Sequence, residues 1–345
     1  MCVKDTGTKY QLWISDFNID GTFTRVHPFI ISHTKTMTRT REDSKEEVFS
    51  ACIKPDDTRY LGGNKNSSVD AIKLQGRPRT GISYNKANEF CANRGDWVTM
   101  IDYLEYCAIQ ALCYIEYANF DNQAALNTNL TSDGFKQGGL GAGVTNLNWE
   151  RWTAFNDNNP IVQTYWTAEH NIGNGSTNGD HYELGNYNTD GSNLSTYPAV
   201  YRGILNFFGD IWTFIRDIVI INKDKDYNTV YLLKKGVNHS DVTKDNVNEK
   251  CYLIGHQANT NDFITEFDFQ RGVYFIPNKV GSNKKADYNW IRGSNGQDTD
   301  KAVRVLRLGG HANAGSRAGS GAFHSGWVRS DSSANVGFFT TVKLD

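Results

Sequence analysis

The chain has 345 residues and a formal charge of −2, from 36 basic and 38 acidic side chains. Domains usually have about 100–200 residues, so this length allows about two domains or one elaborated domain. Aromatic residues make up 12% and charged residues only 21%, and glycine occupies 32 positions. The aromatic content excludes a wholly disordered chain, the absence of a heptad repeat excludes a coiled coil, and the near-neutral charge argues against nucleic-acid binding.

The sequence contains no apolar run of about 18 residues, so we expect no membrane insertion. Its first residues lack the charged and then apolar pattern of a secretory signal. The six cysteines are scattered without a CxxC pair, and Cys107 and Cys113 lie in an apolar stretch. This pattern predicts buried thiols without disulfides, in a protein made in a reducing cytosol.

The N-terminal part has few core candidates. Residues 10–32 alternate apolar and polar side chains around Asp20-Gly21, which predicts a β-hairpin. The polar residues 35–80 predict strand ends and long loops. We therefore divide the chain into residues 1–79, a hairpin with loops integrated with the main domain, and residues 80–345, the main domain.

Two helices are predicted next. Ser83 is suited to cap a first helix that ends near 93–95. A longer helix is predicted over 98–118, where Thr99 and Asp102 resemble a capping box. Its apolar side chains recur at helical spacing, which is more typical of core packing than of a cofactor site. The buried stripes predicted for the two helices are Ala87, Phe90 and Cys91 in the first, and Met100, Ile101, Leu104, Cys107, Ala108, Ala111, Leu112 and Ile115 in the second.

The rest of the chain predicts short strands. The Asn- and Gly-rich residues 120–200 indicate short strands and functional loops. A last strand, 336–343, is expected to return to the sheet that holds the N-terminal hairpin. This pattern predicts an α+β domain. Further strands are predicted at 204–222 with a bend at Gly209, and at 227–233, 251–255, 262–269, 273–276 and 304–308.

The C-terminal residues 304–339, called the tail below, combine glycines, which permit tight backbone turns, with side chains typical of antibody paratopes and interface hot spots. By themselves these residues fit equally well a recognition surface and a glycine-rich loop without a partner. Residues 291–345 have seven basic and four acidic side chains, a net charge of +3, which mildly favours an anionic partner such as a surface polysaccharide. The candidate ligand-binding residues are Trp290, His311, Asn313, Ser316, Arg317, Ser320, His324, Ser325, Trp327 and Arg329.

Residues 304–339, RVLRLGGHANAGSRAGSGAFHSGWVRSDSSANVGFF, resemble the variable region of C-type-lectin-fold proteins that retroelements diversify in phages. The segment 201–212, YRGILNFFGDIW, is similar to a segment of that family and of many phage structural proteins. Residues 13–28, 275–277 and 287–290 fit the same class, whereas Phe339 stands where the family usually has arginine. The matching tail positions are Gly309-Gly310, Gly315, Ala318-Gly319, Phe323 and Gly337-Phe338.

The resemblance implies a C-type-lectin-like fold of the formylglycine-generating-enzyme-like subclass, with two helices, short strands and long loops. It implies a phage virion protein, made in the host cytoplasm, that recognises the host as a tail receptor-binding protein through a variable region at about 304–339. The expected partners are a bacterial surface receptor (protein or polysaccharide), other virion proteins and further copies of the chain, with relatives suggesting a trimer. The alternative is a head fibre or capsid decoration protein of the same fold.

A formylglycine-generating-type modifying enzyme is less favoured, because such enzymes use cysteines in their C-terminal part and none follows Cys251 here. Glu169-His170 and Asp180-His181 lack the spacing of ligands on one helix face. The glycine-rich residues 138–143 lack the Gly-Lys-Ser/Thr ending of a phosphate loop. We therefore expect no enzyme activity, no cofactor and no metal.

Overall fold

The computed structural model describes residues 80–93, 98–122, 207–209, 211–222, 226–268, 273–282, 287–292, 302–311, 317–333 and 335–342, with residues 201, 204 and 314. Outside these ranges it describes only the backbone of short strands. They are β1 (Cys2–Asp5), β2 (Tyr10–Trp13), β3 (Arg25–Val26), β4 (Thr36–Met37), β7 (Tyr182–Gly185), β8 (Leu194–Thr196), and parts of β9 (Val200–Tyr201) and β10 (Ile204–Leu205).

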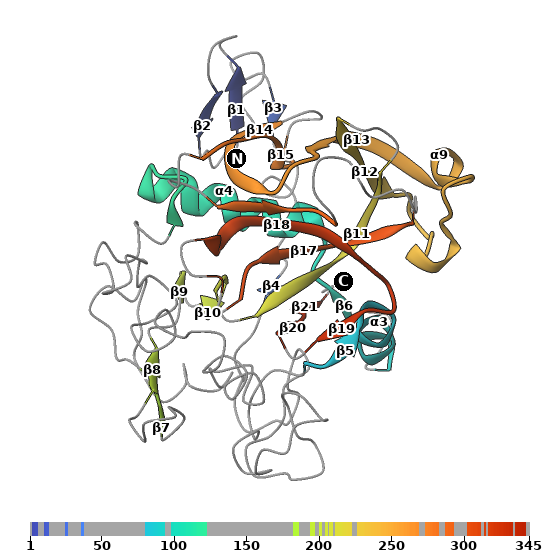
Figure 1. The fold of residues 1–345 in the computed structure, drawn as a ribbon, viewed down its shortest axis with the longest axis horizontal. Helices are drawn as coiled ribbons and strands as arrows, with labels where there is room; N and C mark the ends of the chain where they lie inside the picture. The colour runs from blue at the N-terminus through green and yellow to red at the C-terminus, as the bar shows by residue number, and fades with distance from the viewer. Residues whose placement is uncertain are drawn as a thin grey trace.

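A nine-stranded sheet forms the centre of the molecule (Figure 1). Its strand order is β13-β12-β11-β17-β18-β16-β14-β15, with β20 pairing parallel to β11. The two outer strands approach each other, because a Cβ at Gly255 of β13 would lie 2.6 Å from the side chain of Ile276 in β15. The sheet is therefore nearly closed. Its strands are β11 (Trp212–Asn222), β12 (Tyr227–Leu233), β13 (Cys251–Ala258), β14 (Asp262–Asp268), β15 (Ile276–Val280), β16 (Tyr288–Trp290), β17 (Arg304–Gly309), β18 (Gly319–Val328) and β20 (Val336–Gly337).

The first predicted helix is confirmed as α3 (Tyr84–Ala92). The Ser83 hydroxyl accepts a hydrogen bond from the amide of Lys86 at 3.3 Å and so caps the helix. Ala87 and Cys91 are buried, as predicted, and Phe90 is half-buried. The other short helical elements are η1 (His239–Asp241) and α9 (Val247–Lys250).

The second helix, α4 (Tyr103–Tyr117), begins five residues later than predicted. Residues Val98–Met100 instead form strand β6, which pairs with β21 (Thr340–Val342). The predicted capping box was wrong by one turn: Asp102 caps the helix by accepting from the amide of Glu105 at 2.9 Å, and the Glu105 side chain accepts from the amide of Asp102 at 3.1 Å.

The predicted apolar stripe of α4 is confirmed at Cys107, Ala108 and Ala111, which are buried, whereas Leu104, Leu112 and Ile115 are half-buried. Tyrosines fill much of the interface instead. Tyr103, Tyr106 and Tyr114 pack with rings of the sheet such as Phe323 and Phe275. On the other face of the sheet, Trp212, Phe214 and Val305 pack with α3. Alternate residues of a strand point to opposite faces, so the sheet has an apolar layer on each side.

The terminal strands pair differently from the prediction. Strand β1 lies between β2 and β3, so β2 pairs with the chain before it rather than with the residues after Asp20-Gly21, a turn outside the described residues. The last strands do not return to this small sheet: β20 pairs with β11, and β21 pairs with β6 and β4. In addition, β5 (Ile82–Ser83) pairs with β19 (Ser332–Ser333).

Most strand positions were predicted well. Strand β12 has the predicted bounds, β13, β14 and β17 cover their predicted ranges almost completely, and β15 begins three residues late. Gly209 forms the predicted bend between β10 and β11, with a φ of 90°. The described residues thus form an α+β protein dominated by its sheet. No helix among them is long and apolar enough to cross a membrane.

Candidate functional site

The tail predicted to be a ligand-binding loop is largely a strand. Residues 319–328 form β18, a central strand of the sheet between β17 and β16, in which Phe323 lies opposite Leu308 and Asn289. Gly309, the last residue of β17, and Gly310, which follows it, do adopt positive φ angles of 96° and 76°. The glycines therefore have two functions, since only some of them form turns.

Gly319 and Gly321 are required by close packing. A Cβ at Gly321 would lie 2.6 Å from both the Asp287 carboxyl and the Tyr114 hydroxyl, and a Cβ at Gly319 would overlap the Asp287 carboxyl. The amide of Gly321 donates a hydrogen bond to this carboxyl. Glycine thus brings the backbone of β18 against a buried acid.

Several predicted ligand-binding residues have internal partners. Ser320 is buried and bonds through its amide and hydroxyl to the Asn122 side chain, and buried Ser325 donates to the Trp290 carbonyl at 3.4 Å. Both serines are therefore buried in the protein interior, whereas the prediction that they contact a ligand implies a surface position. Arg329 donates to the His239 carbonyl at 2.6 Å and so ties the end of β18 to η1. Asn313 and Ser316 lie outside the described residues.

The other five predicted residues come together in one group, which we call the Trp–Arg cluster. It joins side chains of β11, β16, β17 and β18 with two residues from the segment between β17 and β18. Three members, Trp212, Tyr288 and Arg307, were not predicted as site residues. The cluster consists of Trp212, Tyr288, Trp290, Arg307, His311, Arg317, His324 and Trp327.

Aromatic rings form the base of the cluster. Trp290 and His324 are stacked, with ring centroids 6.1 Å apart and planes 12° apart. Buried Trp212 meets both edge-on, at 5.0 Å and 5.3 Å. The Nδ1 atom of His324 accepts from the amide of Gly326 at 2.9 Å, so a neutral ring carries its proton on Nε2. These contacts hold the half-buried Trp290 ring in one orientation.

Two arginines lie over these rings. The Arg307 guanidinium carbon is 3.4 Å from the ring centroid of Trp327 and 5.5 Å from that of Trp212. The exposed Arg317 has its guanidinium carbon 5.5 Å from the centroid of Tyr288 and 5.8 Å from that of Trp290. A cation over an aromatic face is stabilised by about 0.5–1 kcal/mol when exposed and by about 2 kcal/mol when desolvated.

Burial and the two arginines keep the two imidazoles neutral. Arg307 is only 2% exposed, and burial lowers the pKa of its guanidinium. Burial, and then the charges of Arg307 and Arg317, lower the pKa of His311 to about 3. Burial and Arg307 likewise lower the pKa of His324 well below its ordinary value. At neutral pH the positive charge of the cluster therefore comes from its arginines.

The missed residues had weak sequence signals. Tyr288 and Trp290 share one face of a strand by period-two alternation, and Arg307 is one of two arginines in a strand whose other residues are apolar or glycine. Trp212 lies in the strand predicted at 204–222, and it is buried. Its contacts with Trp290, His311 and His324 depend on the order of the strands in the sheet, which the sequence does not show.

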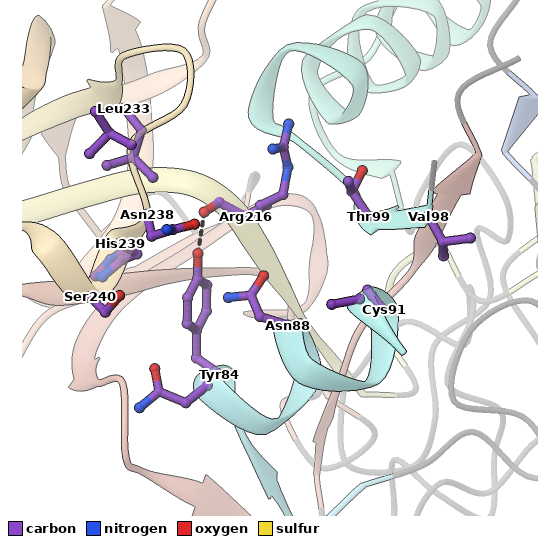
Figure 2. A pocket seen from close by; sticks show the side chains of 13 residues that line it. Tyr84, Asn88, Cys91, Val98, Thr99, Arg216, Leu233, Asn238, His239 and Ser240 are labelled. Carbon is purple, nitrogen blue, oxygen red and sulfur yellow. Dashed lines mark hydrogen bonds between the residues drawn. The ribbon is translucent and has the colours of Figure 1, made fainter. Parts of the chain in front are cut away.

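A separate cavity of about 530 Å³ lies between α3, β6, β11 and η1 (Figure 2). Strand β11 is irregular between Ile215 and Val219, so the carbonyl of Arg216 turns away from β17 and accepts from the Tyr84 hydroxyl. The cavity has no signal in the sequence, because its walls come from several separate segments. The lining residues are Tyr84, Asn85, Asn88, Cys91, Ala92, Val98, Thr99, Arg216, Leu233, Val237, Asn238, His239 and Ser240.

The described residues contain neither a group of three metal ligands nor an exposed cysteine. No group of three or more His, Cys, Asp or Glu among them could hold a metal ion. Cys91, Cys107, Cys113 and Cys251 are free and buried, and burial raises the pKa of Cys113 to about 12 and that of Cys251 to about 11. Such thiols are poor nucleophiles. In the cavity wall, burial lowers the pKa of His239 to about 4.

Comparisons with known proteins add no family to these observations. No model of a known protein family matches the sequence, and no curated protein matches it. The functional argument therefore depends on the residues of the Trp–Arg cluster and on the sequence pattern of the tail.

Proposed function

We propose that this chain is a phage virion protein with a C-type-lectin-like fold, which acts at the tail by binding a receptor on the bacterial surface. One observation carries the proposal: five of the ten residues selected from sequence as ligand-binding lie together in the Trp–Arg cluster. The resemblance of residues 304–339 to diversified variable regions supports the same surface.

The composition of the cluster suits recognition. Trp and Arg are the side chains most enriched at binding hot spots. Trp290 and Trp327 are half-buried and Arg317 is exposed, above the buried pair Trp212 and Arg307. Rings already held by neighbouring side chains lose little conformational entropy when a ligand binds. Several copies in an oligomer, a trimer in our proposal, would strengthen weak single-site binding through avidity.

Binding to cells tests this proposal. The test uses fluorescently labelled chain, a panel of bacterial strains, the variants Arg317→Ala and Trp327→Ala, and Lys235→Ala as a control in the exposed turn after β12. We expect each cluster variant to bind a recognised strain at least about tenfold more weakly, which is about 1.4 kcal/mol. Arg317→Ala should keep its melting temperature, because its side chain is exposed. Cluster variants that bind like Lys235→Ala would contradict the proposal.

The second candidate is a head fibre or capsid decoration protein of the same fold. Tyr252 and Leu253 of β13 are 49% and 42% exposed, and such an apolar pair suits an assembly contact. Immunogold labelling of virions separates the two locations. Gold at the tail supports receptor binding, and gold on the head supports decoration.

A further inference from the structure

We infer that the ligand of the Trp–Arg cluster is a negatively charged saccharide, whose anionic group pairs with Arg317 while its sugar ring packs on Trp290. This inference rests on the proposed function, because it names the receptor class for the same surface. It depends on the charge balance and the ring geometry of the cluster.

The positive charge of the cluster is not compensated by an ion pair among the described residues. No carboxylate described in the structure lies within 4 Å of Arg307 or Arg317. Asp331 acts on Arg307 only from a greater distance, and its carboxylate accepts from the amide of Val328 at 3.0 Å. The Nε atom of Arg307 is buried without a hydrogen-bond partner. A buried cation is costly when unpaired, so an anion nearby would be favourable.

The neutral state of the two imidazoles also favours a negatively charged ligand. Both His311 and His324 lie within the field of Arg307, which, together with burial, keeps them neutral. An anionic group beside Arg317 would reduce the positive potential that Arg307 and Arg317 create at this surface. Arg317 can reach such a group because it is exposed, and its planar guanidinium can bind a carboxylate or a phosphate through two parallel hydrogen bonds.

The rings beside Arg317 favour a sugar over a free anion. A pyranose ring has a face of C–H groups that packs on an aromatic ring, and Tyr288 and Trp290 lie 4.6 Å apart beneath the guanidinium. Apolar faces with a few polar groups are typical of small-ligand sites.

Competition for cell binding by the full-length chain tests the inference. The probes are polygalacturonate, which carries carboxylates, phosphomannan, which carries phosphates, and neutral dextran. We expect an anionic probe to displace the chain from cells at concentrations at which dextran has no effect. Inhibition by polygalacturonate alone identifies a carboxylate, and inhibition by phosphomannan alone identifies a phosphate. Raising NaCl from about 0.05 M to about 0.5 M should weaken binding several-fold, because salt screens an exposed charge.

Two variants complete the test. Arg317→Lys should keep part of the inhibition because it keeps the charge, whereas Lys235→Ala should behave like the original chain. The inference is overturned if neither anionic probe inhibits, or if dextran inhibits equally well. The proposed function fails separately, if Arg317→Ala and Trp327→Ala bind cells normally.

Discussion

Asp287 explains why β18 contains glycine at two positions. Its carboxyl accepts hydrogen bonds from the amide of Gly321 and, at 3.4 Å, from the Tyr114 hydroxyl. Side chains at residues 319 and 321 would displace it. Burial raises the pKa of Asp287 to about 8, and the charge of Asp121 acts in the same direction. The folded protein therefore holds a proton on this carboxyl at neutral pH.

This proton makes stability depend on pH. Because the pKa is about 8 in the folded chain and 3.8 without the fold, the unfolded chain binds fewer protons between these values, and stability falls as pH rises. One proton corresponds to about 1.4 kcal/mol per pH unit. We expect Asp287→Asn to remove up to about 2 kcal/mol of the loss seen between about pH 6.5 and pH 8 in urea unfolding.

The buried imidazoles of His239, His311 and His324, whose pKa burial lowers, contribute a slope of the opposite sign near pH 6.5, and this slope remains in the variant. Asp217, whose pKa burial and the neighbouring Asp102 also raise, contributes a slope of the same sign and remains in the variant. The exposed Asp245→Asn is the matched control. An unchanged slope in Asp287→Asn would show that Asp287 is ionised in the folded protein.

At the scale of elements, α4 shows what its cap contributes. Asp102 accepts from the amide of Glu105, and its carboxylate lies 3.6 Å from the Arg216 guanidinium. We expect Asp102→Ala to lower the free energy of unfolding by about 1 kcal/mol more than Asp102→Asn, because Asn keeps the capping oxygen and loses only the charge. Urea unfolding of both variants measures this difference. Equal losses would mean that the ion pair, and not the cap, is the important contact.

The helices and strands also show where sequence reasoning ends. The apolar stripe predicted α4 and its buried side, because helical periodicity is a local property. Its first residue was wrong because Val98–Met100 pairs with Thr340–Val342, a partner about 240 residues away that no local pattern reveals. Strand β18 was mistaken for loops because its glycines match a turn pattern, whereas Gly319 and Gly321 are fixed by contact with Asp287 and Tyr114.

At the scale of the molecule, the sheet brings together residues far apart in sequence. Five residues of the Trp–Arg cluster could be selected from the sequence, because aromatic and cationic side chains between glycines are typical of recognition surfaces. They are Trp290, His311, Arg317, His324 and Trp327. The buried residues beneath them, Trp212 and Arg307, could not be selected, since their position depends on the pairing of β18 with β17 and β16. The cavity beside α3 depends on an irregularity in β11 and was equally invisible in the sequence.

The core beneath α4 and the proposed binding surface lie on opposite sides of the sheet. Tyrosines and phenylalanines on the α4 side fill the largest core cluster, while Trp212, Trp327 and Arg307 of the Trp–Arg cluster lie on the other side of the sheet. The glycine-rich part of the tail, which was predicted to form loops, thus includes the central strand β18. Its small residues permit close packing of its neighbours on one side and support the Trp–Arg cluster on the other.

Hydroxyl-radical footprinting of the chain, with and without cell envelopes of a recognised strain, tests the central claim most directly. Half-buried Trp290 and Trp327 should be oxidised in the free chain and protected when it is bound, while exposed Tyr252 is oxidised equally in both states. Protection at Tyr252, with unchanged oxidation of Trp290 and Trp327, would contradict the assignment of the Trp–Arg cluster as the binding surface.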